Sequence, residues 1–214
     1  MVPASRIRAC NVETVRTDGD YILYWMISSR RLSSNFSLQR AAELAVELKK
    51  PLVLFEPLRI GSLWTCDRIH CFVIDGMQEN SIRIAALKNP GLLYFPYVEP
   101  KPDAGKGLLA RLAERACVVV TDDFPCSFVP RMVAAAATQL RVRLEAVDSI
   151  GLLPLRATDR VFTTAFSFRA FLQKQLLPHL DEFPKPNPLE RLRLPPTQSL
   201  PHEIMVAFRS AKER

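Results

Sequence analysis

The stretch Asp20-Tyr-Ile-Leu-Tyr-Trp-Met26, followed by Arg30-Arg31 and then by Asn35-Phe-Ser-Leu38, decides the fold. Residues 21–27 are apolar without alternation, which is typical of a central strand covered on both faces. The polar residues after this strand indicate a turn, and the apolar spacing after the turn indicates a helix. We therefore expect a buried strand that leads over a short turn into a helix.

The same alternation of strand and helix continues to about residue 149. Ser33 or Ser34 can cap the first helix, which we expect to run to about Lys50. The further strands and helices that we expect are strands Pro51–Leu58, Leu92–Tyr97, Cys117–Thr121 and Val142–Val147, and helices at about Asp67–Leu87, Gly107–Ala116 and Pro130–Leu140. Five strands that alternate with four helices predict an α/β fold, a five-stranded doubly wound parallel sheet of the Rossmann-like type.

Beyond Gly151 the pattern changes. Residues 162–177 have apolar side chains at helical spacing, and prolines are then dense from Phe183 to Pro196, which favours an extended path. We divide the chain into an α/β domain, residues 1–155, and a C-terminal helix with a Pro-rich extended linker, residues 156–214. The last stretch, residues 201–214, could form one helix. We expect the segment from residue 185 onward to be mobile and to expose the apolar side chains of Leu192, Leu194, Leu200, Ile204 and Phe208.

Composition sets broad limits on function. The chain has 214 residues, of which 48% are hydrophobic, enough for one core. Its apolar runs are far shorter than the ~18 residues that span a bilayer, and its N-terminus lacks an apolar signal core, so we expect a cytoplasmic protein without a membrane segment. The net charge of +7 fits a nucleic-acid partner, but the basic residues are spread out and also fit an ordinary solvated surface.

Several common sites find no support in the motifs. The five cysteines include no C-x-x-C pair, so we expect neither a metal site nor a disulfide framework. Lys106 is followed by Gly107, which does not fit a phosphate-binding loop, and no G-x-G-x-x-G is present. Three scattered histidines without a G-x-S-x-G motif give no hydrolytic triad. We therefore assign no catalytic residue.

A doubly wound sheet binds ligands outside the carboxyl ends of its strands, where the strand order reverses. The candidate site is therefore built from the residues at these strand ends, which are Ser28, Ser29, Arg30, Arg31, Thr121, Asp122, Asp123, Asp148 and Ser149.

The residue types suggest roles within this set. We expect Arg30 and Arg31 to contact an anionic ligand, because arginine binds anions in a bidentate manner. Asp122 or Asp123 could bind a ribose or ribityl hydroxyl. Both acids could instead be turn and capping residues, and we favour this structural interpretation because no histidine lies nearby to complete a metal shell.

The same segments carry a family resemblance. The strand end Tyr24-Trp-Met26, the arginines and the helix start at Asn35 resemble the N-terminal α/β (photolyase-like) domain of class II cyclobutane-pyrimidine-dimer DNA photolyases, in the cryptochrome/photolyase superfamily. Further segments are similar to that family, namely residues 67–77, 97–100, 119–125, 130–133, 145–148 and 162–169. Ser34, Ile150 and Thr163 depart from its usual pattern.

The resemblance implies a function. It implies that the chain is the N-terminal domain of a class II deoxyribodipyrimidine photolyase, or a truncated or split product, in the light-dependent repair of UV-damaged DNA. In such a protein FAD carries the chemistry and lies in a helical domain, which we expect to be absent here and to act in cis or in trans. The chain could hold a deazaflavin-type antenna chromophore, and Asn35 joins the cofactor-binding set on this basis. The alternative is a non-catalytic module of the same fold that binds a chromophore, a nucleotide or a partner.

Overall fold

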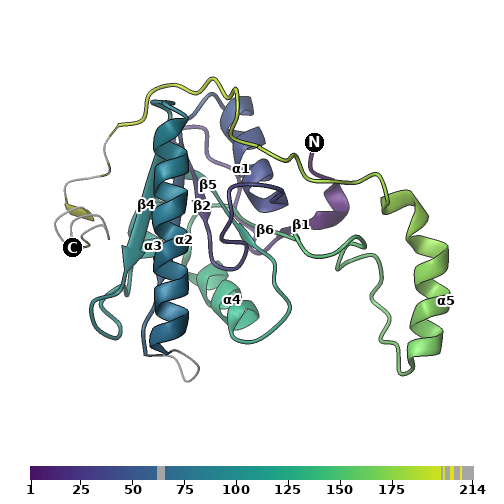
Figure 1. The fold of residues 1–214 in the computed structure, drawn as a ribbon. Helices are drawn as coiled ribbons and strands as arrows, with labels where there is room; N and C mark the ends of the chain where they lie inside the picture. The colour runs from purple at the N-terminus through teal and green to yellow at the C-terminus, as the bar shows by residue number, and fades with distance from the viewer. Residues whose placement is uncertain (62–65, 199, 201–202, 205–207, 209–214) are drawn as a thin grey trace.

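The computed structural model describes residues 1–61, 66–198, 200, 203–204 and 208, and its centre is a six-stranded sheet (Figure 1). The strands are β1 (Ile7–Ala9), β2 (Tyr21–Trp25), β3 (Leu52–Leu58), β4 (Leu92–Val98), β5 (Ala116–Asp122) and β6 (Leu144–Val147). They lie in the order β1-β6-β5-β2-β3-β4. Strands β2 to β6 are parallel to one another, and β1 is antiparallel to β6.

The prediction of a five-stranded sheet is wrong. All five predicted strands are present, but residues 7–9 add a sixth at the edge, where Ile7 lies opposite Val147 and Ala9 opposite Glu145. This strand has three residues with Arg8 at its centre, so it contains neither an apolar run nor a readable alternation. The sheet is therefore mostly parallel, with one antiparallel edge strand.

Helices cover both faces of the sheet. The described helices are α1 (Phe36–Glu47), α2 (Asp67–Ala86), α3 (Leu108–Glu114), α4 (Val129–Gln139), α5 (Ala165–Gln175) and the 3₁₀ turns η1 (Ala4–Arg6) and η2 (Leu177–His179). Ile22 and Tyr24 of β2 belong to a core shared with α1 and α2, whereas Leu23 and Trp25 belong to a second core shared with α3 and α4. Successive residues of β2 thus point to opposite faces, and both faces are apolar because both are covered.

The N-cap of helix α1 comes after both of the residues expected to cap it. Asn35, not Ser33 or Ser34, is the N-cap, and its side-chain oxygen accepts a hydrogen bond from the backbone N–H of Leu38. Ser34 is in the left-handed region with φ 47°, whereas Asn35 has the extended backbone that a cap requires. Asn35 therefore both starts α1 and, as described below, ties it to the turn after β2.

We call residues 185–208 the tail. Leu189 and Leu194 lie in the core on the α1–α2 face, while Leu200 and Phe208 lie in the core on the α3–α4 face. The tail therefore passes round the edge of the sheet at β4 (Figure 1).

Specific contacts hold the tail against this edge. The N–H of Thr197 donates to the carbonyl of Pro90 at 2.9 Å. A Cβ atom on Gly91 would lie 2.4 Å from Cβ of Leu194, so only glycine allows the tail to approach this closely.

The expectation that the tail exposes its apolar side chains is wrong. Leu194, Leu200, Ile204 and Phe208 are buried, and Leu192 is half-buried. Proline prevents the tail from burying these side chains within itself, but they bury against the two faces of the sheet instead. Most of the helix predicted for residues 201–214 lies outside the described residues.

We call residues 152–183 the arm. It contains α5, none of whose residues is buried, and it stands apart from the sheet in Figure 1. Its inner contacts are local: the ring of Phe162 lies 5.4 Å from that of Phe168 and 5.0 Å from that of Phe171. Several large apolar side chains of the arm are exposed, namely Leu152, Leu155, Val161, Phe166, Phe168, Leu177, Leu180 and Phe183.

Among the described helices, none combines the length and the hydropathy that a membrane crossing requires.

Candidate functional site

The strand order reverses between β2 and β5. From β2 the chain passes through α1 on one face to β3, and it returns to β5 through α3 on the other face. The connections thus diverge at the carboxyl ends of β2 and β5, which is where such sheets open to ligands. We call the residues at these two strand ends the switch point.

The carboxylate of Asp122 fills the switch point. It is the last residue of β5 and is 1% exposed. Its Oδ2 accepts the backbone N–H groups of Ile27, Ser28 and Ser29 at 3.1, 2.8 and 2.9 Å. Its Oδ1 accepts the hydroxyl of Tyr24 at 2.9 Å. These four donors use the acceptor capacity of a carboxylate, so Asp122 holds the turn after β2.

Asn35 joins the same turn to α1. Its amide nitrogen donates to the carbonyls of Ser29 and Arg31 at 2.9 and 3.1 Å. Its oxygen accepts the hydroxyl of Ser149 at 3.2 Å in addition to the N–H of Leu38. The N–H of Ser37 donates to Ser149 Oγ at 3.1 Å. An anion at the start of α1 would have to displace these side chains to reach the N–H groups.

Tyr24 completes this buried network. Its hydroxyl also accepts a hydrogen bond from the amide of Asn35 at 3.0 Å. Burial raises the pKa of the Tyr24 phenol well above its usual value, and the charge of Asp122 adds to the rise. The phenol is therefore a permanent donor to Asp122.

A second buried carboxylate, that of Glu56, lies next to the switch point. Glu56 accepts hydrogen bonds from Arg30 Nη1 and Asn80 Nδ2, each at 3.1 Å, and from the hydroxyl of Tyr94 at 2.6 Å. Burial and the neighbouring Glu56 charge both raise the pKa of Tyr94. Arg30 also donates to the carbonyl of Pro57 at 2.6 Å. Glu56 thus compensates the charge that we expected Arg30 to offer to an anionic ligand.

Asp148, after β6, forms a buried ion pair with Arg6 at 3.4 Å, and both side chains are fully buried. Its carboxylate accepts the N–H groups of Ile150 and Leu155 at 2.8 and 2.7 Å. Burial raises the pKa of Asp148, although these N–H groups and Arg6 oppose the rise. Arg6 also donates to the carbonyl of Leu152 at 2.6 Å. This cluster fixes the first residues of the arm.

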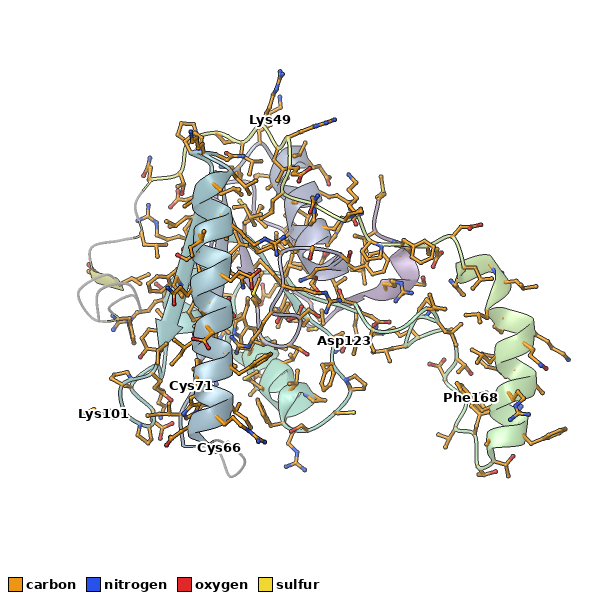
Figure 2. All side chains as sticks on the ribbon, viewed as in Figure 1. Lys49, Cys66, Cys71, Lys101, Asp123 and Phe168 are labelled. Carbon is orange, nitrogen blue, oxygen red and sulfur yellow. The ribbon has the colours of Figure 1, made fainter. Side chains whose placement is uncertain are left out.

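Asp123 also lies at the base of the arm. It pairs with Arg8 at 3.2 Å and with Arg156, and its place after β5 is labelled in Figure 2. Burial raises the pKa of Asp123, but the hydrogen bonds from Arg156 and Arg8 outweigh burial and hold it below its usual value.

The structure brings only part of the predicted set together. Ser28, Asn35 and Asp122 meet at the switch point, and Thr121 lies beside them with its hydroxyl donating to the carbonyl of Trp25 at 2.8 Å. Arg31 is set apart. It is exposed, and its guanidinium donates to the carbonyl of Ser34 at 3.1 Å.

Sequence reasoning did not identify the partners of these residues, which are Arg6, Arg8, Tyr24, Glu56, Asn80, Tyr94 and Arg156. One signal was present: an acid stands inside the otherwise apolar stretch of β3, Leu-Val-Leu-Phe-Glu-Pro-Leu. An acid within a buried strand requires a hydrogen-bonding or charged partner, so the sequence indicates Glu56 as a member of a buried polar cluster.

The buried residues of the switch point do not fit a flavin or a deazaflavin. Their donors and acceptors are bonded to one another, and the α1 N–H groups of Ser37 and Leu38 already have partners. Ser28, Arg30 and Arg31, which are not fully buried, are the groups that an antenna chromophore could still reach. Within the described part of the chain, no three metal-binding side chains gather.

Comparison with known proteins gives one informative relative. The chain is similar to a deoxyribodipyrimidine photo-lyase. That protein, from Methanothermobacter thermautotrophicus, is 29% identical over 195 residues, which are 91% of this chain. No protein-family profile matches the chain. The similarity supports a place in the photolyase superfamily.

The chain spans 41% of the length of this photolyase relative. The relative therefore contains more chain than the α/β sheet, the arm and the tail described here.

Proposed function

We propose that the chain is the N-terminal α/β part of a class II deoxyribodipyrimidine photolyase, which repairs cyclobutane pyrimidine dimers in DNA under light. The observation that supports this most is the extent of the similarity, which covers 91% of the chain and not a single motif. The α/β sheet with its buried switch point is consistent with it. We expect the protein to act in the cytoplasm.

In this proposal the chain has a supporting role. FAD, held by a helical domain in cis or in trans, supplies the electron that splits the dimer. Residues 1–155 form the α/β domain, in which Asp122 and Asn35 lock the turn after β2. Residues 156–214 form the connection between domains.

The arm supports the presence of a second domain. Phe166 is 81% exposed, Leu177 70% and Phe183 67%, and a cluster of exposed apolar side chains marks an interaction site. An 11-residue helix such as α5 is also marginal in water unless it packs against a partner. We expect the arm to pack against the helical FAD domain. This replaces the tail, which already has a packing partner, as the expected contact.

An antenna chromophore of the deazaflavin type would bind outside the switch point. Arg31 is the cation there whose partner is only a carbonyl, so it is the best remaining anion contact. Titration of a deazaflavin by fluorescence against wild type and Arg31→Ala should show weaker binding to the variant. Equal affinity would remove Arg31 from the site.

The repair proposal is tested by adding a helical photolyase domain to the chain. Thymine-dimer loss in irradiated oligonucleotides under blue light is measured for the chain alone with FAD, for a helical photolyase domain alone, and for the two together. We expect no turnover by the chain alone and more turnover by the mixture than by the helical domain. Substantial turnover by the chain alone would contradict the assignment of catalysis to the second domain.

A second candidate function is a non-catalytic interaction module of the same fold. The exposed arm favours it, because an apolar surface needs a partner but does not need that partner to be an enzyme. In the mixing experiment, binding of a helical domain without a gain in repair would favour this alternative.

A further inference from the structure

An open pocket of about 370 Å³ lies at the amino end of β4, at the end of the sheet opposite the switch point. It lies where the tail crosses the connection between α2 and β4. Its lining includes Lys88, Asn89 and Pro90 from that connection and Arg191, Leu192 and Arg193 from the tail. The pocket therefore forms only when segments about a hundred residues apart in the sequence come together.

Contacts with Asn89 and Gly91 fix the position of the tail along this pocket. The amide of Asn89 donates to the carbonyl of Leu192 at 2.9 Å, and Leu194 packs on Gly91. Along this extended segment Leu192 is half-buried, Arg193 is exposed and Leu194 is buried. The alternation puts the apolar side chains against the body and leaves Arg193 in solvent.

The pocket has a marked charge. Lys88, Arg191 and Arg193 line it, and no acidic side chain does so. Within the described part of the chain, none of the three has an ion pair. Other arginines at the same end of the sheet differ, because Arg16 is paired with Asp18 and Arg115 with Asp20.

Helix-end electrostatics account for only one of these cations. Lys88 follows the C-terminus of α2, where a positive charge is favourable by about 0.3–1 kcal/mol. Arg191 and Arg193 belong to no helix of the described chain, so this effect gives no reason for them. The partial charge of about −0.5 at a helix end also offsets only a small part of three positive charges.

We propose that this pocket binds the phosphodiester backbone of nucleic acid. Arginine forms bidentate hydrogen bonds with phosphate oxygens, and lysine adds a point charge. Three cations from two chain segments line this one pocket, and a phosphodiester backbone carries a negative charge at every phosphate along its length. Lys49, labelled in Figure 2, is a further exposed cation, and the net charge of +7 favours the same partner. The site needs neither light nor a DNA lesion, so it does not rest on the proposed repair function.

The test measures binding of a short undamaged DNA duplex in the dark, by fluorescence anisotropy at several salt concentrations. The pocket variant is Lys88→Gln/Arg191→Gln/Arg193→Gln. The matched control is Lys101→Gln/Lys106→Gln/Arg131→Gln, which removes three exposed cations, two from the connection after β4 and one from the first turn of α4. Figure 2 labels Lys101 at the end of the molecule away from Lys49.

We expect the pocket variant to bind DNA more weakly and to lose about 0.9 of salt-dependence slope for each phosphate contact removed, and the control to keep most of both. Equal losses in the two variants would show an effect of net charge alone and would overturn the site, as would unchanged binding in the pocket variant.

A titration with inorganic phosphate at constant ionic strength tests whether the pocket binds free phosphate instead of nucleic acid. Tight phosphate binding that the pocket variant loses, without DNA binding by wild type, would overturn the nucleic-acid assignment. Urea unfolding of each variant checks that the fold is retained.

Discussion

The tail and the arm are both rich in apolar side chains, but the tail buries them and the arm exposes them. Both contain several large apolar side chains within about thirty residues of chain. Those of the tail are buried on the two faces of the sheet, as Leu194 and Leu200 show, whereas those of the arm are exposed, as Phe166 and Leu177 show.

The difference follows from backbone geometry. Around Leu194 the tail is extended and alternates its side chains, so it can lie along the edge of the sheet and place Leu192 and Leu194 against the body. The arm forms a helix that satisfies its own backbone, which leaves its apolar side chains free to contact another surface. Apolar content therefore does not tell a buried segment from a docking segment, because the burial depends on what lies beside it.

The largest expected effect comes from truncating one apolar side chain in each region. Leu194→Ala should lower the free energy of unfolding by about 2–5 kcal/mol, because it leaves a cavity in a core. Phe166→Ala, in the arm, should change it by less than about 0.5 kcal/mol. Urea unfolding of both variants measures this, and similar losses would show that the tail and the arm are packed alike.

A smaller effect is expected from the glycine beneath the tail. Gly91→Ala should lower the free energy of unfolding by about 1–3 kcal/mol, since the new Cβ would meet Leu194 and Pro195 at under 3 Å. The matched control is Gly76→Ala, within α2, where a Cβ meets nothing within 4 Å. The control should stabilise the protein by about 0.5–1 kcal/mol. A stable Gly91→Ala variant would mean that the tail does not press on this position.

The arm should affect binding and not stability. Phe166→Ser/Leu177→Ser should change the free energy of unfolding by less than about 0.5 kcal/mol but weaken binding of a helical photolyase domain, measured by calorimetry. The control is Phe72→Ser/Ile82→Ser, which removes two exposed apolar side chains from α2. If the α2 variant loses as much affinity as the arm variant, the arm is not the docking surface.

The smallest effect is a pH dependence at the base of the arm. The lowered pKa of Asp123 contributes stability above the unfolded value of 3.8, and this is lost as pH falls through the folded-state pKa. The raised pKa of Asp148 acts in the opposite sense, because the folded state then binds protons more readily than the unfolded state.

We expect the destabilisation caused by Asp123→Asn to shrink as pH falls below about 3.8. Carboxyl NMR titration of the wild type should place the midpoint of Asp123 below that of Asp148. The amide chemical shift of Thr197, in the tail, is the control and should not follow either titration. The reverse order of the two midpoints would contradict the ion pairs at the base of the arm.

The sequence predicts the central strands because β2 to β6 are runs of buried apolar residues bounded by turns. It does not predict β1, because three residues form no pattern. It also does not predict the burial of Leu194, because the segment has no helical period and its burial depends on the position of Gly91 beside it. At the site, Asp122 lies at the end of a strand, as expected, and its carboxylate is bonded to groups of the turn after β2. Its N–H partners could not be predicted, since they depend on the path of the turn after β2.

The path of the tail has a consequence for biosynthesis. Strand β4 leaves the ribosome about 100 residues before the segment that covers its edge, which is roughly 5–20 s at ordinary rates of translation. During that interval the sheet presents an open edge to other nascent chains. Pro96, inside β4, has no N–H to offer and hinders pairing with a foreign strand. During synthesis Pro96 therefore protects the edge of β4, and in the folded protein the tail protects the same edge.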